Sequence, residues 1–127
     1  MQKLEIEPTK TTLGISFDPN KHLLEFYGKS YPTNPVTFFQ PLINWVEKYL
    51  LFYPSENTKL LFRMEYFNTS SSTFLYKMLE MFDVHHQKFS NVEIIFECSD
   101  KEDDVIDSWK SLLEDLDLPC EIKIQEL

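Results

Sequence analysis

The sequence predicts an α/β fold: one mixed β-sheet with an N-terminal hairpin, parallel β-α-β crossovers and about three helices. Two observations lead to this prediction. Short segments with strand patterns open the chain, and further strand patterns then alternate with three longer segments of helical period. Strands joined through a helix within one sheet run parallel, with right-handed crossovers. At 127 residues the chain has the length of one domain, residues 1–127, around one core.

The N-terminal segments predict short strands. Residues 3–7, 13–17 and 22–27 alternate polar and apolar side chains, as half-buried strands do. Asp18-Pro19-Asn20-Lys21 lies between the last two and has the composition of a turn. We therefore expect residues 13–17 and 22–27 to form a hairpin.

A loop and the first helix follow. Two prolines fall within residues 30–35, and each restricts the residue before it, so we expect a stiff loop. Apolar residues recur at helical spacing from Thr37 onward, and Thr37 with Gln40 fits a capping box. The composition of residues 53–57 indicates the end of this helix.

The central feature of the sequence is a strand that leads directly into a helix. Residues 60–67 are apolar and aromatic, residues 68–73 carry cap-forming side chains, and an apolar pattern of helical period begins at Phe74. The junction is a helix N-terminus with up to five hydroxyls, where unpaired N–H groups and the helix dipole favour an anion. One interpretation is a phosphoryl acceptor; the other is that Asn68 or Thr69 simply caps the helix.

The last third of the chain repeats this alternation. Residues 91–98 predict a strand, and the acidic residues 100–104 suit the first turn of a third helix. The third helix has a clear apolar stripe from Val105 to Leu116. Residues 120–124 alternate and predict a closing edge strand.

The predicted topology brings three loops together. Residues 30–35, 68–72 and 99–104 each follow a parallel strand, so all should lie at one edge of the sheet, where ligands and partners usually bind. The acidic third loop would repel a phosphate at the junction. Arg63 is the only arginine, and we expect it in a cross-strand ion pair. A phosphate would therefore act outward, on a partner.

Composition excludes several classes of function. Lys and Arg total 12 against 21 Asp and Glu, and a net charge of −9 repels nucleic acid and anionic membranes. No apolar run approaches the ~20 residues of a membrane span, so we expect a soluble, cytoplasmic protein. Cys98 and Cys120 are expected to be buried thiols. Only two glycines occur, which excludes a glycine-rich nucleotide loop, and we expect no cofactor.

Two rival functions remain to be compared with a phosphoryl acceptor. Glu65, Asp83, His85 and His86 are acid–base residue types, but they fall on predicted opposite faces, and adjacent histidines are poorly placed to share a metal. We expect surface histidines that compensate the helix dipole, no metal site and no enzyme. A small-ligand carrier with an aromatic pocket is the second rival, although the aromatic residues lie at core spacing.

The sequence resembles the bacterial SiaC-like phosphoprotein family over roughly residues 22 to 90. The resemblance is carried by a Ser-Tyr-Pro-x-Asn loop coupled to an Asn-Thr-Ser-Ser junction, together with aromatic and proline positions of the first helix. The matching residues are 28–34, Phe39, Pro41, Trp45, Tyr49, Leu50 and 66–71.

The resemblance implies a STAS-like fold, as in anti-sigma factor antagonists, and a non-catalytic regulatory role. It implies Thr69 as the phosphoacceptor of a SiaB-like Ser/Thr kinase, with dephosphorylation by a PPM-type phosphatase. In the best-known system the unphosphorylated form activates a diguanylate cyclase and so feeds cyclic-di-GMP signalling for biofilm formation. We expect the partner surface to comprise Thr69 with its turn and the adjacent loop: Asn68, Ser70, Ser71, Ser30, Tyr31, Pro32 and Asn34.

Two alternatives stay open at this point. Anti-sigma factor antagonists present an Asp-Ser pair with a nearby glycine, whereas here Asn68 precedes Thr69 and no glycine follows. Action on transcription as such an antagonist is therefore the alternative to cyclase control. Ser70, Ser71 and Ser72 are alternative phosphoacceptors, because the assignment to Thr69 rests on the resemblance.

Overall fold

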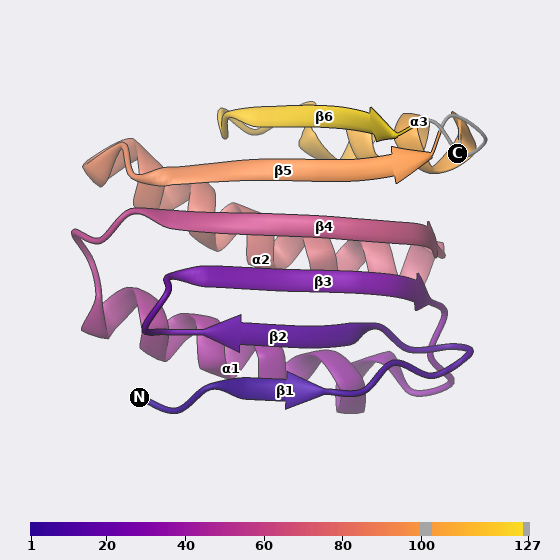
Figure 1. The fold of residues 1–127 in the computed structure, drawn as a ribbon, viewed down its shortest axis with the longest axis horizontal. Coiled ribbons are helices and arrows are strands. Elements are labelled where there is room, and N and C mark those ends of the chain that lie inside the picture. The colour runs from indigo at the N-terminus through magenta and orange to yellow at the C-terminus, as the bar shows by residue number, and fades with distance from the viewer. Residues whose placement is uncertain (100–102, 126–127) are drawn as a thin grey trace.

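The structure, a computed structural model, describes residues 1–99 and 103–125. One six-stranded sheet lies against three helices, all on the same face of the sheet (Figure 1). The mixed α/β fold predicted from the sequence is confirmed. In chain order the elements are β1 (Leu4–Ile6), β2 (Gly14–Asp18), β3 (Leu23–Ser30), α1 (Pro35–Phe52), β4 (Thr58–Phe67), α2 (Thr69–Phe89), β5 (Val92–Ser99), α3 (Asp103–Leu113) and β6 (Cys120–Gln125).

The strands lie in the sheet in the order of the sequence. β1, β2 and β3 are antiparallel neighbours, which confirms the hairpin, and β3 to β6 are parallel neighbours. Each crossover adds its strand on the same side of the previous one. Right-handed crossovers that all advance in one direction put every helix on one face, and Figure 1 shows this arrangement.

The core fills the space between the sheet and the helices. Alternate residues of the central strands point inward and pack as aromatic pairs: the Phe26 and Phe62 rings are stacked with centroids 4.3 Å apart. Trp109 of α3 is fully buried against Phe62 and Phe96. Because this one layer of side chains holds all three helices to the sheet, the other face of the sheet stays open.

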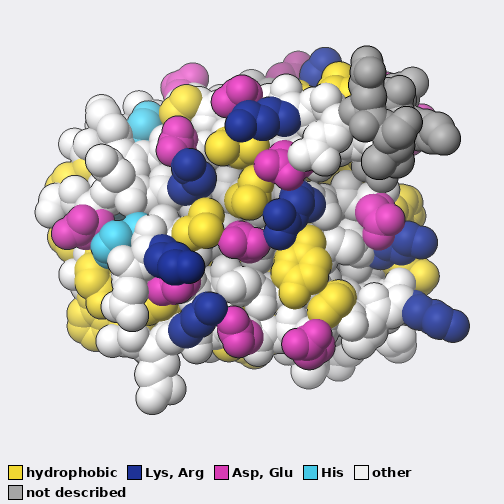
Figure 2. All heavy atoms as spheres, viewed as in Figure 1, with side chains coloured by type: hydrophobic (Ala, Val, Ile, Leu, Met, Phe, Trp, Pro, Cys, Tyr) yellow, Lys and Arg dark blue, Asp and Glu magenta, His cyan; other side chains and the backbone are white. Residues whose placement is uncertain are grey.

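The open face carries charges of both signs around isolated apolar side chains (Figure 2). Oppositely charged side chains pair across neighbouring strands. Arg63 of β4 lies 2.9 Å from Glu25 of β3, and Lys59 lies 3.7 Å from Glu93 of β5. The predicted cross-strand ion pair of Arg63 is confirmed.

A β-bulge shapes the end of β3 and β4. Gly28 pairs with Met64, but Lys29 pairs with Tyr66, so Glu65 is an extra residue in β4. Gly28 has φ = 97°, a conformation that side-chain-bearing residues rarely adopt. The bulge turns two successive β4 side chains outward and returns Phe67 to the core. As a result, Ser30 lies opposite Phe67, next to the start of α2.

The first helix begins earlier than predicted. α1 starts at Pro35, and Asn34 caps it by accepting a hydrogen bond from the Thr37 N–H at 3.3 Å. The predicted capping box was wrong because Thr37 lies inside the helix, and the Gln40 side chain donates to Asn44, one turn further along. The loop is correspondingly shorter than predicted: Ser30 belongs to β3, and only residues 31–34 connect the two elements.

Other boundaries differ in smaller ways. α3 ends at Leu113, before the end of the predicted stripe at Leu116, because the following residues turn toward α2, where the Asp117 N–H donates to Asp83. Part of the acidic loop, residues 100–102, lies outside the described residues. Cys98 is buried as predicted, whereas Cys120 is only half-buried. No helix in the described ranges is long and apolar enough to span a bilayer.

Candidate functional site

The strand-to-helix junction forms a capped helix N-terminus. Asn68 accepts a hydrogen bond from the Ser71 N–H at 2.9 Å through its side chain and one from the Ser72 N–H through its carbonyl. Its own N–H donates to the Ser30 carbonyl at 3.0 Å. Of the two interpretations made from the sequence, capping by Asn68 is therefore correct, but it does not exclude a second role for the residues that follow.

Ser71 connects the junction to the adjacent strand end. Its hydroxyl donates to the Ser30 carbonyl at 3.0 Å and lies 2.7 Å from the Ser30 hydroxyl. Both side chains are fully buried. Neither hydroxyl can touch a partner or a modifying enzyme in this conformation, so these two predicted site residues hold the turn in place from inside.

The other hydroxyls of the cluster differ in their engagement. Ser72 and Thr73 both donate to the carbonyl of Thr69, at 2.7 and 3.4 Å. Thr69 and Ser70 are exposed, and in the described part of the chain their hydroxyls have no hydrogen-bond partner. The N–H groups of the same two residues precede the first intrahelical bond. The structure thus leaves two accessible alcohols beside two available N–H donors.

An exposed aromatic pair lies at the same edge of the sheet. Tyr31, in the loop after β3, meets Tyr66, near the end of β4, in an edge-to-face contact with centroids 5.9 Å apart. Both rings remain accessible, at 39% and 49% exposure. Of the other predicted loop residues, Pro32 is buried and Asn34 is exposed at the α1 cap. Tyr66 was not predicted, because only the bulge turns it outward.

Among the described residues, no ion pair or hydrogen bond brings a cationic side chain to the junction, where it could hold a phosphate. The Arg63 guanidinium is paired with Glu25, and in the described ranges no other arginine exists to replace it. Lys29 and Lys10 line a hollow together with Tyr31, next to the bulge. The edge therefore combines two free alcohols, an aromatic pair and nearby lysines on one accessible surface.

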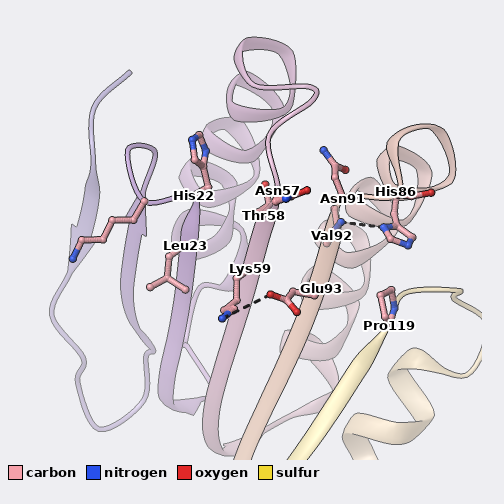
Figure 3. A pocket seen from close by; sticks show the side chains of 12 residues that line it. His22, Leu23, Asn57, Thr58, Lys59, His86, Asn91, Val92, Glu93 and Pro119 are labelled. Atoms are coloured by element: carbon pink, nitrogen blue, oxygen red, sulfur yellow. Dashed lines mark hydrogen bonds and ion pairs between the residues drawn. The ribbon is translucent and has the colours of Figure 1, made fainter.

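A second hollow lies at the opposite end of the sheet, where β3, β4 and β5 begin (Figure 3). Two of its polar side chains bond to backbone groups: His86 accepts a hydrogen bond from the Val92 N–H, and the Asn91 amide nitrogen donates to two carbonyls of the loop before β4, while among the described residues the buried Asn91 Oδ1 has no partner. His22 contacts the hydroxyl of Tyr49. This polar hollow does not provide the aromatic pocket that a small-ligand carrier of the predicted kind would use.

The two adjacent histidines are structural. His86 accepts a hydrogen bond from the N–H of Val92, the first residue of β5, and His85 lies 2.7 Å from the Pro54 carbonyl oxygen. They were predicted as surface groups that compensate the helix dipole, but both are half-buried and bind backbone groups. Burial lowers the pKa of His85, an effect that its contact with Pro54 partly offsets. Within residues 1–99 and 103–125, no group of three or more metal-ligating side chains is found.

The fold and the site define a small α/β domain in which the N-terminus of α2 is exposed at one edge of the sheet. A family model described as the SiaC family regulatory phosphoprotein matches residues 6–125. The chain belongs to the SiaC family. This membership makes it a regulatory protein and not an enzyme, as the sequence predicts.

Known relatives agree with this assignment along nearly the whole chain. An uncharacterised protein of Pseudomonas aeruginosa strain UCBPP-PA14 is 28% identical over 99% of both chains. The structure of SiaC of Pseudomonas aeruginosa, also 28% identical, superposes with a TM-score of 0.91 over 98% of this chain and 100% of its own. The same relative, solved as the activator in a complex with the diguanylate cyclase SiaD, gives a TM-score of 0.90 over 96% of this chain and 99% of its own.

Proposed function

We propose that this protein is a cytoplasmic partner switch whose unphosphorylated form binds and activates a diguanylate cyclase. In this proposal a SiaB-like Ser/Thr kinase phosphorylates Thr69 and thereby releases the cyclase, and a PPM-type phosphatase restores binding. The observation that carries the proposal is the free, exposed hydroxyl of Thr69 at the first residue of α2, beside the Tyr31–Tyr66 pair. The solved complex of a relative with a cyclase favours this partner over the alternative, action on transcription as an anti-sigma factor antagonist.

A phosphate at Thr69 suits the local structure. The N–H groups of Thr69 and Ser70 and the positive end of the α2 dipole would stabilise the added charge by about 0.3–1 kcal/mol. Since Asn68 already caps the helix and Thr69 points outward, the domain has no need to rearrange. Phosphorylation would therefore change the surface and leave the fold intact.

The same phosphate would oppose a partner that covers the edge. It adds about −1.5 to −2 charges at pH 7, and the only arginine of the sequence is already paired with Glu25. Desolvating an unpaired dianion against the tyrosines of the edge would cost several kcal/mol, which corresponds to a loss of about a hundredfold or more in affinity.

Intact-mass analysis after incubation with a SiaB-like kinase and ATP tests the acceptor. We expect one phosphate on the wild type and on Ser70→Ala, and none on Thr69→Ala. Ser70→Ala is the matched control, because Ser70 is the other exposed hydroxyl of the same turn. Phosphate on Thr69→Ala would refute the assignment.

Calorimetric titration with the cyclase tests the switch. Thr69→Ala should bind as the wild type does, while the phosphorylated protein and Thr69→Asp should bind more weakly. Equal binding by all four forms would rule out control by charge at this position.

A further inference from the structure

A second surface lies on the helical layer, away from the junction. It is a groove between the C-terminal part of α1, the middle and C-terminal part of α2 and the turn after α3, here called the helical groove. Its apolar lining consists of Leu50, Leu51, Tyr76, Met81, Val84 and Leu116. Leu51 and Val84 are 79% and 58% exposed, which is unusually open for large apolar side chains that line the same groove.

The groove also carries four carboxylates, those of Glu47, Glu80, Asp83 and Asp115. None of them forms an ion pair in the described ranges; Asp83 instead accepts hydrogen bonds from Gln87 and from the Asp117 N–H. The groove therefore combines an apolar floor with uncompensated negative charge.

We propose that the helical groove docks a cationic amphipathic helix of a partner protein. An apolar stripe at i, i+3, i+4 and i+7 would cover the floor, and flanking Lys or Arg side chains would meet the four carboxylates. The inference does not depend on Thr69, because the groove begins at Tyr76, two turns into α2.

Charge argues against the other occupants. A second copy of this chain lacks a suitable helix: α1 carries one lysine, Lys48, α2 carries Lys77 and Lys88, and α3 carries Lys110, so none has a cationic stripe. An anionic membrane would be repelled by the carboxylates. A basic amphipathic helix would cover the apolar lining of the groove and pair with its carboxylates.

The test uses a synthetic amphipathic helix as the probe. A peptide of about 18 residues, or roughly five turns, carries Leu at the stripe positions and Lys elsewhere, and its matched control carries Glu in place of Lys. In titrations of isotope-labelled protein we expect the Lys peptide to shift amide resonances of residues 47–51, 76–85 and 115–116. The Glu peptide should bind at least about tenfold more weakly.

Substitutions test whether the Lys peptide binds in the groove or is merely attracted by the net negative charge of the protein. Glu80→Lys and Asp115→Lys should each lower the affinity of the protein for the Lys peptide by about fivefold. Glu65→Lys makes the same change in net charge on the open face of the sheet and should change affinity by less than about twofold. Leu51→Asp should abolish binding without unfolding the protein, because the side chain is mostly exposed. Thr69→Asp should bind the Lys peptide as the wild type does, which distinguishes this surface from the proposed switch.

Several outcomes would overturn the inference. These are equal binding of both peptides, equal effects of Glu80→Lys and Glu65→Lys, resonance shifts outside the groove, or no binding at all. Sedimentation with phosphatidylglycerol vesicles that Leu51→Asp abolishes would assign the groove to a membrane. A dimer in light scattering that the same variant dissociates would assign it to a second copy.

Discussion

The hydroxyl oxygens of Ser30 and Ser71 lie 2.7 Å apart in the core, joining the last residue of β3 to the first turn of α2. Ser71 also donates to the Ser30 carbonyl, and the Asn68 N–H donates to the same carbonyl. The end of one strand thus fixes the turn that presents Thr69. This arrangement makes stability and the geometry of the site depend on the same few bonds.

Ser71→Ala should destabilise the domain by about 1–3 kcal/mol, because it removes two hydrogen bonds and leaves the buried Ser30 hydroxyl unsatisfied. Ser30→Ala should cost less, since Ser71 keeps its bond to the Ser30 carbonyl. The double variant should cost less than the sum of the two, because no orphaned hydroxyl remains. Urea unfolding measures all three, with exposed Ser70→Ala as a control expected within about 0.5 kcal/mol of wild type. Strict additivity would contradict the coupling.

Asn68→Ala should cost about 1 kcal/mol by removing the α2 cap, whereas Asn68→Asp should retain most of the stability. Asn34→Ala at the α1 cap is the comparison. Its bond to the Thr37 N–H is longer, 3.3 Å against 2.9 Å, so we expect a smaller loss. Thermal unfolding followed by circular dichroism measures both. A larger loss of stability in Asn34→Ala would show that the lengths of the two capping hydrogen bonds do not reflect their strengths.

Gly28→Ala should destabilise the domain by about 1–3 kcal/mol, because φ = 97° is unfavourable for any residue with a Cβ. Space is not the reason, since the nearest atom to an added Cβ is 3.9 Å away, on Pro8. Gly14→Ala provides the contrast: its added Cβ would collide with the Tyr27 ring. Shortening Tyr27 to Ala should therefore rescue Gly14→Ala but not Gly28→Ala in chemical denaturation. Rescue of both would argue against backbone strain at Gly28.

The helices and strands could be predicted from the sequence, and so could the edge of the sheet at which β3 ends and α2 begins. Hydrophobic periodicity and the crossover rules make this possible because they act over many residues. Every strand and helix of the described ranges was predicted, and the end of β3 does lie against the start of α2. Local choices were less predictable. Thr37 and Asn34 are both acceptable cap residues, and the signal that favours Asn34 is Pro35, which occupies the first helical position.

Two features of the site were not predicted from the sequence. The bulge at Glu65 turns Tyr66 outward, and its only sequence signal is a lone glycine on the neighbouring strand. The burial of Ser71 had a signal that could have been read. Ser71 precedes Leu75 by four residues and Met78 by seven, which places it on the core face of α2.

Acidification should destabilise the protein partly through His85. Burial lowers its pKa in the folded state below the unfolded value of about 6.5, so the unfolded chain binds the proton more tightly. The contribution of His85 to the free energy of unfolding is fully present above the unfolded pKa and is lost as the pH falls through the folded pKa. We expect the wild type to lose more stability than His85→Gln between about pH 7.5 and pH 5.5 in urea titrations. Parallel losses in the two proteins would exclude His85 as a contributor.

Tyr66→Ser should weaken binding of the proposed cyclase by about tenfold or more and change the stability of the free domain little. The Tyr66 ring is 49% exposed and meets Tyr31 beside the free hydroxyl of Thr69, so a partner that covers this edge would bury both rings. Tyr31→Ser should act in the same direction, and the double variant should lose less than the sum, because each ring positions the other.

Phe52→Ser is the matched control for this measurement. Phe52 is another exposed aromatic residue, 66% accessible, but it ends α1 at the opposite edge of the sheet. Calorimetry with the purified cyclase should therefore give wild-type affinity for Phe52→Ser. If Tyr66→Ser binds as tightly as Phe52→Ser, the aromatic pair does not belong to the partner surface, and recognition must rest on the alcohols and backbone donors of the turn.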